Sequence, residues 1–296
     1  MIVATTHVLR QSAVPRAPYE ARTATMPGAS AVERWCPNSF IEGPIPPARF
    51  STLLQEWKRN CVSVRLHVST EDHDTLERFL QQGFSLDPSR HPLIWNPDPF
   101  LTLIRDFQVP TPTFEEFLPR IPEPGIAGDD GVLLTCPRLS DLDDLCVGED
   151  ELAGRPYAIF KPRPREVLAP WLGSAFFSWR AGPSSVLIVR SGPDERPMAK
   201  LTVRKLVPPG VLDVGYATLA QHRGGGVAAR AVRTLTRWLF THAWVQRIEM
   251  GIKPDNRASL KTATTAGYDY EGTRRSRLAN LDGTFSDEWS YVAVNG

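Results

Sequence analysis

Hydrophobic and polar residues alternate over residues 61–68, where aliphatic side chains are separated by single polar residues. A period of two predicts a strand with one buried face. On either side, residues 47–59 and 70–82 carry apolar side chains at the three- and four-residue intervals of an amphipathic helix. Gly83 follows the second helix in the position of a C-cap. The pattern therefore predicts a helix–strand–helix unit early in the chain.

A longer series of strands and helices is predicted from residue 131 onward. Apolar runs bounded by turn residues predict strands over residues 132–134, 185–190, 198–207, 211–219, 245–252 and 284–294. Apolar residues at helical spacing predict helices over residues 140–146, 164–180, 227–240 and 257–266. Ser140 and Asn256 each stand where they can cap one of these helices. The fold class indicated is α/β.

Proline is concentrated between these two patterned regions. The chain of 296 residues holds 27 prolines, many of them between residues 87 and 124. This length favours about two domains, and a proline-rich stretch between patterned regions is typical of a connecting segment. We therefore predict a smaller domain over residues 1–96, a linker over residues 97–130 and a larger domain over residues 131–296.

Composition argues against several classes of protein. The formal net charge is +1, so no overall field favours nucleic acid or an anionic membrane. No apolar run approaches the roughly 18 residues of a membrane span. The four cysteines form no Cys-x-x-Cys pair, and the histidines show no zinc-binding spacing. We therefore expect no metal, and reduced thiols in a cytoplasmic protein.

Three consecutive glycines, Gly224 to Gly226, join the predicted strand of residues 211–219 to the helix of residues 227–240. Glycines at such a junction allow a tight turn and a close approach of a ligand to the backbone. The start of the helix also presents free N–H groups at its positive end, which favours phosphate binding. The spacing, Gln221-x-x-Gly224-x-Gly226, is neither that of a P-loop nor that of a dinucleotide-binding fold.

The small domain repeats part of the larger one. Shifted by 184 positions, its predicted strand, the helix that follows and Gly83 fall on residues 245–252, the next helix and Gly267, without a gap. Any strand–helix–glycine unit would give a similar match, so duplication is one of two explanations. In place of the glycines the first copy has residues 41–44, Ile-Glu-Gly-Pro. Because proline lacks an N–H and glutamate repels phosphate, we predict a degenerate half-copy that does not bind the same ligand.

The second half resembles the GNAT superfamily of acyl-coenzyme A-dependent N-acetyltransferases, and within it the branch that acetylates N-termini of ribosomal proteins. The matching motifs run in order along residues 131–294: Asp213-Val-Gly-Tyr216, Gln221-x-x-Gly224-x-Gly226, Asn256-x-x-Ser259 and Gly267-Tyr268. The resemblance implies a mixed, mostly antiparallel sheet that splays open and is flanked by helices. The pairing with a smaller degenerate copy is reminiscent of two-domain acetyltransferases.

The resemblance also implies acetyl-coenzyme A or another acyl-coenzyme A as cosubstrate. Its pyrophosphate would lie on the N–H groups of the glycine loop, and its pantetheine arm beside the end of the preceding strand. Asn256 matches the family's Asn near the pantetheine, and it could equally be a plain N-cap. The residues predicted to bind the cosubstrate are Thr218, Leu219, Ala220, Gln221, Arg223, Gly224, Gly225, Gly226, Val227, Ala228, Asn256 and Ser259.

Asp213 is the predicted catalytic residue, because an acceptor amine must lose a proton before or during attack. It stands two residues before Gly215, where this branch usually has an acidic residue, and could hold a water or the amine; it could also be a plain surface carboxylate. The sequence departs from the superfamily at Ala263, where other members carry an acidic Tyr, and from the branch at Arg230, where Glu is common. Water or coenzyme A itself would then accept the proton, and acceptor specificity does not carry over.

We therefore predict an N-acyltransferase that moves an acetyl or other short acyl group to a primary amine of a small molecule or peptide N-terminus. The attack is direct, since no Cys or Ser stands in a nucleophile setting. Two alternatives stay open. In one, the donor is bound to an acyl carrier protein or tRNA, docked by the degenerate half and by Arg274, Arg275 and Arg277. In the other, the chain is a non-catalytic sensor of acyl-coenzyme A.

Overall fold

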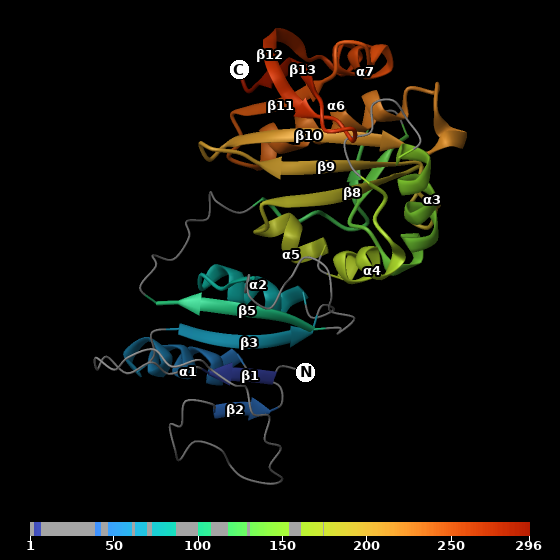
Figure 1. The fold of residues 1–296 in the computed structure, drawn as a ribbon. Coiled ribbons are helices and arrows are strands. Elements are labelled where there is room, and N and C mark those ends of the chain that lie inside the picture. The colour runs from blue at the N-terminus through green and yellow to red at the C-terminus, as the bar shows by residue number, and fades with distance from the viewer. Residues whose placement is uncertain are drawn as a thin grey trace. The chain divides into compact units, whose positions relative to one another are not determined.

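The computed structural model contains two compact units, one formed by residues 1–92 and 98–112 and the other by residues 93–97 and 113–296 (Figure 1). The residues that it describes are 3–6, 39–42, 47–60, 63–69, 73–86, 100–107, 118–128, 131–153, 161–173 and 175–296. Among the helices of these residues, none combines the length and the apolar character that a membrane crossing requires.

The first unit is a five-stranded sheet with two helices. Its elements are β1 (Val3–Thr6), β2 (Ser39–Glu42), α1 (Pro47–Asn60), β3 (Ser63–Ser69), α2 (His73–Gln81), β4 (Ser85–Leu86) and β5 (Phe100–Asp106), in the sheet order β2-β1-β3-β5-β4. The predicted helix–strand–helix series is confirmed as α1, β3 and α2. The helices meet through Phe50 and Phe79, whose ring centroids are 4.8 Å apart at an edge-to-face angle.

Strand β5 lies within residues 97–130, which the sequence predicts as a linker. It pairs along its length with β3 and at two positions with β4. Leu103 of β5 is fully buried, so the strand belongs to the core of the first unit and not to a connection. The surrounding prolines obscure this strand in the sequence. The domain boundaries predicted at residues 96 and 131 stay a prediction.

The second unit is built on an eight-stranded sheet. Its strands are β6 (Ile126–Ala127), β7 (Leu133–Thr135), β8 (Ser184–Arg190), β9 (Ala199–Lys205), β10 (Val211–Thr218), β11 (Arg247–Ile252), β12 (Asp269–Ala279) and β13 (Phe285–Val294), in the order β12-β13-β11-β10-β9-β8-β7-β6. Every neighbouring pair is antiparallel except β10 and β11, which are parallel. The predicted mixed, mostly antiparallel sheet is confirmed.

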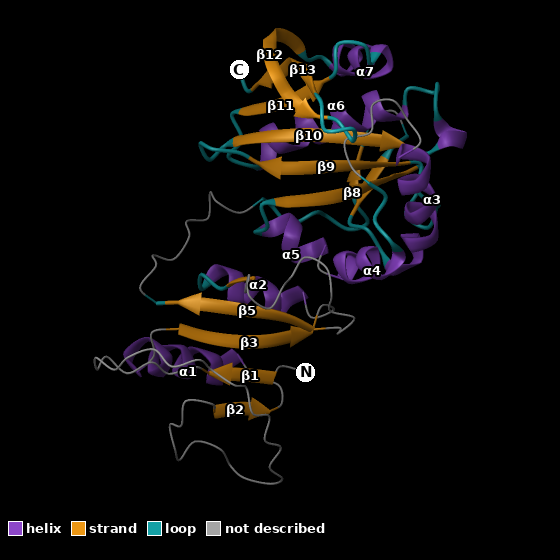
Figure 2. Cartoon of the chain, viewed as in Figure 1, coloured by secondary structure: helices purple, strands orange, loops and turns teal. Residues whose placement is uncertain are grey.

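Helices cover both faces of this sheet (Figure 2). They are α3 (Leu142–Ala153), preceded by a short 3-10 turn, α4 (Arg165–Gly173), α5 (Ala175–Arg180), α6 (Val227–His242) and α7 (Arg257–Ala266). Strand β8 shows the two layers: Leu187 and Val189 join the main core with α6, whereas Val186 and Ile188 join a second cluster with α3 and α4. The single helix predicted over residues 164–180 is in fact two, α4 and α5.

Strand β12 is absent from the sequence prediction, which expects no element between Gly267 and residue 284. Its burial pattern is almost entirely exposed, and it forms one edge of the sheet. An edge strand that carries charged residues has no apolar alternation for sequence reasoning to detect. Arg274, Arg275 and Arg277 therefore lie on this edge strand.

The two units share a local connectivity. In the first, β3, α2, β4 and β5 follow one another and β5 lies between β3 and β4; in the second, β11, α7, β12 and β13 follow one another and β13 lies between β11 and β12. Gly83 and Gly267 both end the helix with positive φ, 80° and 89°. The shared order supports the predicted duplication, which stays a prediction. The units differ beside this motif, because β3 neighbours the antiparallel β1 whereas β11 neighbours the parallel β10.

Candidate active site

Strands β10 and β11 separate after a short paired section. They are in register only from Val211 opposite Arg247 to Asp213 opposite Glu249. Beyond that point β10 continues beside β9 as far as Thr218, and β11 continues beside β13. A cavity of about 820 Å³ lies at the split, and both strands line it. The edge of β10 that faces the split has no strand partner among the described residues after Asp213.

The glycine loop closes one end of β10 and starts α6. After a 3-10 turn over Ala220–His222, Gly224 and Gly226 take positive φ values of 80° and 71°, a conformation that favours glycine. Gly226 is the N-cap of α6 and contributes no side-chain hydrogen bond. The first N–H groups of α6 have no intrahelical acceptor, as at any helix start. The loop therefore presents open donors at the positive end of a helix.

Two arginines stabilise this loop through its carbonyl groups. Arg230 Nη1 donates to the carbonyl of Gly225 at 2.6 Å, and Arg223 Nε donates to the carbonyl of Thr218 at 3.1 Å. The Nε of Arg230 is buried without a hydrogen-bond partner in the described part of the chain. Arg230, where the sequence departs from the ribosomal-protein branch, thus lies on α6, bonds the loop and adds positive charge beside the loop's donors.

The other residues predicted to bind the cosubstrate differ in whether their polar groups are already hydrogen-bonded and in whether they line the cavity. The N–H of Leu219 donates to the carbonyl of Met198 at 3.0 Å, so this group is already occupied. Asn256 caps α7, since its side chain accepts from the N–H of Ser259 at 3.2 Å, and both residues also line the cavity. Tyr216, which sequence reasoning did not assign to the site, lines the cavity as well, and its hydroxyl donates to the carbonyl of Ser259 at 3.0 Å.

Comparison with known proteins finds a family model that matches the part of the chain that holds this site. Residues 132–269 match the family model described as the acetyltransferase (GNAT) domain. Residues 132–269 are a GNAT acetyltransferase domain. Among curated proteins, the probable N-acetyltransferase YjcK of Bacillus subtilis (strain 168) is 29% identical over 82 residues, which are 28% of this chain and 45% of that protein. The chain therefore matches less than half the length of this relative.

Solved structures show the same fold at low identity. The Microcin C7 self immunity acetyltransferase MccE, in complex with acetyl-CoA and AMP, is 16% identical with a TM-score of 0.51, over 59% of this chain and 98% of that one. The ribosomal L7/L12 alpha-N-protein acetyltransferase RimL, in complex with coenzyme A, is 14% identical with a TM-score of 0.50, over 57% and 97%. A GNAT-family acetyltransferase from Bacillus anthracis is 14% identical with a TM-score of 0.50, over 57% of this chain and 98% of that one.

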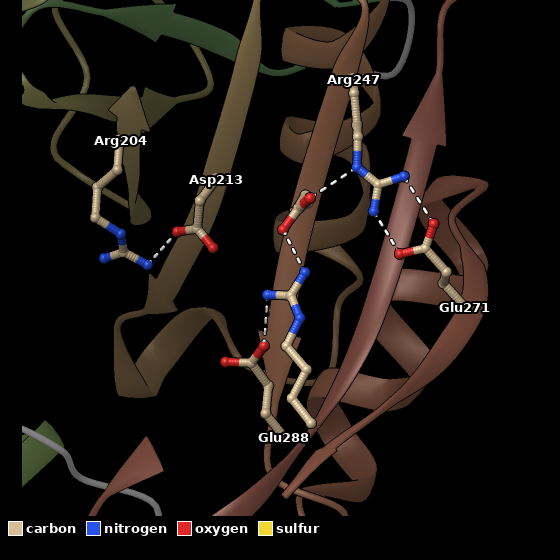
Figure 3. A network of polar contacts seen from close by, with 7 residues as sticks. Arg204, Asp213, Arg247, Glu271 and Glu288 are labelled. Atoms are coloured by element: carbon tan, nitrogen blue, oxygen red, sulfur yellow. Dashed lines mark hydrogen bonds and ion pairs between the residues drawn. The ribbon is translucent and has the colours of Figure 1, made fainter. Parts of the chain in front are cut away.

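Asp213 of the GNAT domain lies at the last paired position before the split. Its cross-strand partner on β9 is Arg204, and the two side chains form an ion pair (Figure 3). Burial raises the pKa of Asp213 above its usual value, and the charge of Arg204 opposes that rise without cancelling it. Arg204 lines the cavity, so the pair stands at the point where the two strands part.

A second network neighbours this pair on β11 (Figure 3). Glu249 lies opposite Asp213 and accepts from Arg274 Nη2 and from Arg247 Nε, both at 2.7 Å. Arg274 also bonds Glu288 at 3.0 Å. Burial opposes ionisation of Glu249, but hydrogen bonds from Arg274 and Arg247 outweigh it and lower its pKa. Arg274 thus pairs with two carboxylates of its own domain, and its role in docking a carrier stays a prediction.

A charged cluster on the α3 and α4 side of the cavity was missed by sequence reasoning. Glu149 of α3 accepts from Arg163 Nη2 at 2.8 Å and forms an ion pair with Lys200 of β9. Trp171 of α4 lies under the guanidinium of Arg163, whose Cζ is 4.8 Å from the ring centroid. The sequence held one usable signal for this cluster. Along β9, buried residues alternate with partly exposed ones, and Lys200 and Arg204 lie on the same, partly exposed face. Glu149 and Arg163 carry no such pattern.

Replacement of Glu149 by Gln is expected to destabilise the domain by about 3 kcal/mol at neutral pH. Burial alone would raise the pKa of this carboxyl, but the hydrogen bond of Arg163 and the charge of Lys200 outweigh it and lower the pKa from 4.5 to about 2. A depressed pKa contributes stability that is complete above the unfolded value and is lost as the pH falls toward the folded one.

Denaturant unfolding of the two proteins between about pH 7 and about pH 3 measures this loss. The difference in unfolding free energy between wild type and Glu149→Gln should shrink below about pH 4.5. Glu166→Gln is the matched control, because Glu166 is exposed on the first turn of α4. Equal losses in both variants, or a difference that does not change with pH, would contradict the assigned role of Glu149.

Proposed function

We propose that the GNAT domain transfers an acetyl or other short acyl group from acyl-coenzyme A to a primary amine. One observation carries the proposal: a glycine loop with open N–H donors directly follows the strand that parts from its parallel neighbour, and a cavity of about 820 Å³ lies at that parting. A diphosphate on the loop and a thioester between the strands would be joined by an extended arm along the free edge of β10. The structures of MccE in complex with acetyl-CoA and of RimL in complex with coenzyme A support this choice of cosubstrate.

The chain's own residues fit this cosubstrate. The backbone donors from Gly224 to Ala228, together with the charges of Arg223 and Arg230, suit a diphosphate. The N–H of Arg223 is already donated to the carbonyl of Ala220 at 3.2 Å. Glycine at positions 224 and 226 leaves the approach to those donors open, because a Cβ at Gly224 would meet no atom within 4 Å and one at Gly226 would meet only Arg230. Asn256 and Ser259 line the cavity from α7, where the pantetheine end would lie.

Asp213 is proposed as the base that receives the amine's proton, directly or through a water. Its raised pKa makes it a better base than Glu149, whose pKa of about 2 leaves it ionised but weakly basic. A covalent enzyme intermediate is disfavoured at Cys136, because burial and the nearby charge of Glu123 raise the pKa of its thiol to about 12. The amine then attacks the thioester carbonyl directly, and the coenzyme leaves as a thiol.

Binding and turnover can be tested separately. Acetyl-coenzyme A and coenzyme A should both raise the unfolding temperature of the full chain, whereas ATP should not; a ligand at about 100 times its Kd stabilises by about 2.7 kcal/mol. Thiol release over a panel of primary amines then measures transfer. Absence of any shift would overturn the cosubstrate assignment. A shift with no thiol release for any amine would indicate a sensor, and release only with a carrier-bound donor would indicate the carrier-dependent alternative.

A further inference from the structure

The cavity at the split is lined mainly by positive charge. Of its lining side chains in the described part of the chain, five are cationic and one is a carboxylate: Lys161, Arg163, Lys200, Arg204 and Lys253, against Glu149. The formal net charge of the whole chain is only +1, so this excess is local. A concave site with one sign of charge concentrates ligands of the opposite sign.

The carboxylates near the cavity do not neutralise these cations. Glu149 is shared by Arg163 and Lys200, and Asp213 pairs with Arg204. The side chains of Lys161 and Lys253 have no hydrogen bond or ion pair to another described residue, although the charge of Lys253 contributes to the lowered pKa of Asp282. Lys253 is nevertheless 7% exposed, so its ammonium group is held in the wall of the cavity and not spread into solvent. Glu149 and Asp213 thus pair with three of the five cations.

The cosubstrate leaves this charge unmatched as well. Its diphosphate is proposed to lie on the loop from Arg223 to Ala228, and none of those residues lines the cavity. The pantetheine arm and the thioester that enter the split are uncharged. We therefore expect the other substrate to supply an anion that binds the cations on β9, at Lys161 and beside α3.

We propose, on the basis of the acyl transfer proposed above, that the acceptor is a small amine that also carries an anionic group, a carboxylate or a phosphate. The anion binds between Lys161 and the Arg163–Lys200 pair, and the amine points toward Asp213 and the split. Trp171, which lies under Arg163, supplies an apolar wall for the carbon chain between the two groups. Polyamines and basic peptide N-termini are disfavoured, because they bring a like charge to the same wall.

Matched pairs of amines test this class of acceptor. Thiol release is measured at saturating acetyl-coenzyme A with phosphoethanolamine against ethanolamine, and with γ-aminobutyrate against butylamine, spermidine serving as the cationic arm. We expect kcat/KM to be at least about tenfold higher for the anionic member of one pair, since a charged hydrogen bond in a concave site contributes that much discrimination. The pair of amines with the larger ratio of kcat/KM values shows whether the preferred anionic group is a carboxylate or a phosphate.

Lys161→Gln tests the location of the anion. It should raise KM for the preferred anionic amine by about tenfold with kcat nearly unchanged, and Lys161→Glu should raise it further while improving the relative rate with spermidine. Lys261→Gln is the matched control, because Lys261 is exposed on α7 and does not line the cavity. Turnover without preference for anionic amines, or equal effects of the Lys161 and Lys261 variants, would overturn this inference while leaving acyl transfer intact. No turnover with any amine would instead overturn the proposed function itself.

Discussion

Gly226→Asp should weaken binding of acetyl-coenzyme A by about 100-fold or more, which corresponds to about 2.7 kcal/mol. Gly226 is the N-cap of α6 and has a φ of 71°, and a Cβ there would lie 3.4 Å from Arg230 Nη1. A carboxylate at this position would compete for Arg230 and for the open N–H groups of the helix start. It would also repel the diphosphate that those groups are proposed to bind.

The fold should survive this change. Asp and Asn are among the residues that most readily adopt a positive φ and that cap helices well. Gly226→Asn is therefore the matched control, because it has the same shape without the charge. Isothermal titration with acetyl-coenzyme A, and circular dichroism of each variant, measure binding and folding. Affinity retained by Asp, or lost equally by Asp and Asn, would argue that the loop does not bind the diphosphate.

The elements that position the glycine loop could be predicted from the sequence. Strand β10, the loop and α6 have distinct signals: an apolar run, three adjacent glycines and apolar residues at helical spacing. The same holds for α7, where Asn256 and Gly267 mark the two ends. Burial makes these signals strong, because most apolar residues of these elements lie in one core.

The rest depended on tertiary contacts that no local pattern records. Strand β12 is an exposed edge strand. The helices α4 and α5 are separate, but the helical spacing of apolar residues in the sequence does not change between them. The cavity gathers Glu149, Lys161 and Lys200 from three separate segments. The pairing of Asp213 with Arg204 follows from the antiparallel register of β9 and β10, which becomes known only once the strands are placed side by side. Sequence reasoning could therefore identify Asp213 but not the cations around it.

Asp213→Asn should lower kcat by about 100-fold or more with the best amine acceptor, the lower end of what a general base contributes. Asn keeps the shape of the side chain but cannot accept a proton, and it loses the charge that pairs with Arg204. KM for acetyl-coenzyme A should change little, because Asp213 is near the first end of β10, whereas the loop that is proposed to bind the cosubstrate follows the other end of that strand. Thiol release at saturating amine, over a range of acetyl-coenzyme A concentrations, measures both parameters.

The variant Arg204→Gln tests whether Asp213 acts as a base or only holds Arg204 in place. The charge of Arg204 lowers the pKa of Asp213 against the effect of burial, so its removal should raise that pKa further. A base acts in its ionised form, so kcat rises with pH as Asp213 loses its proton, and in Arg204→Gln this rise should move to higher pH. At the plateau, kcat of this variant should fall by less than about tenfold. If both variants lose the same activity and the pH profile does not move, Asp213 acts only through Arg204 and another group or water receives the proton.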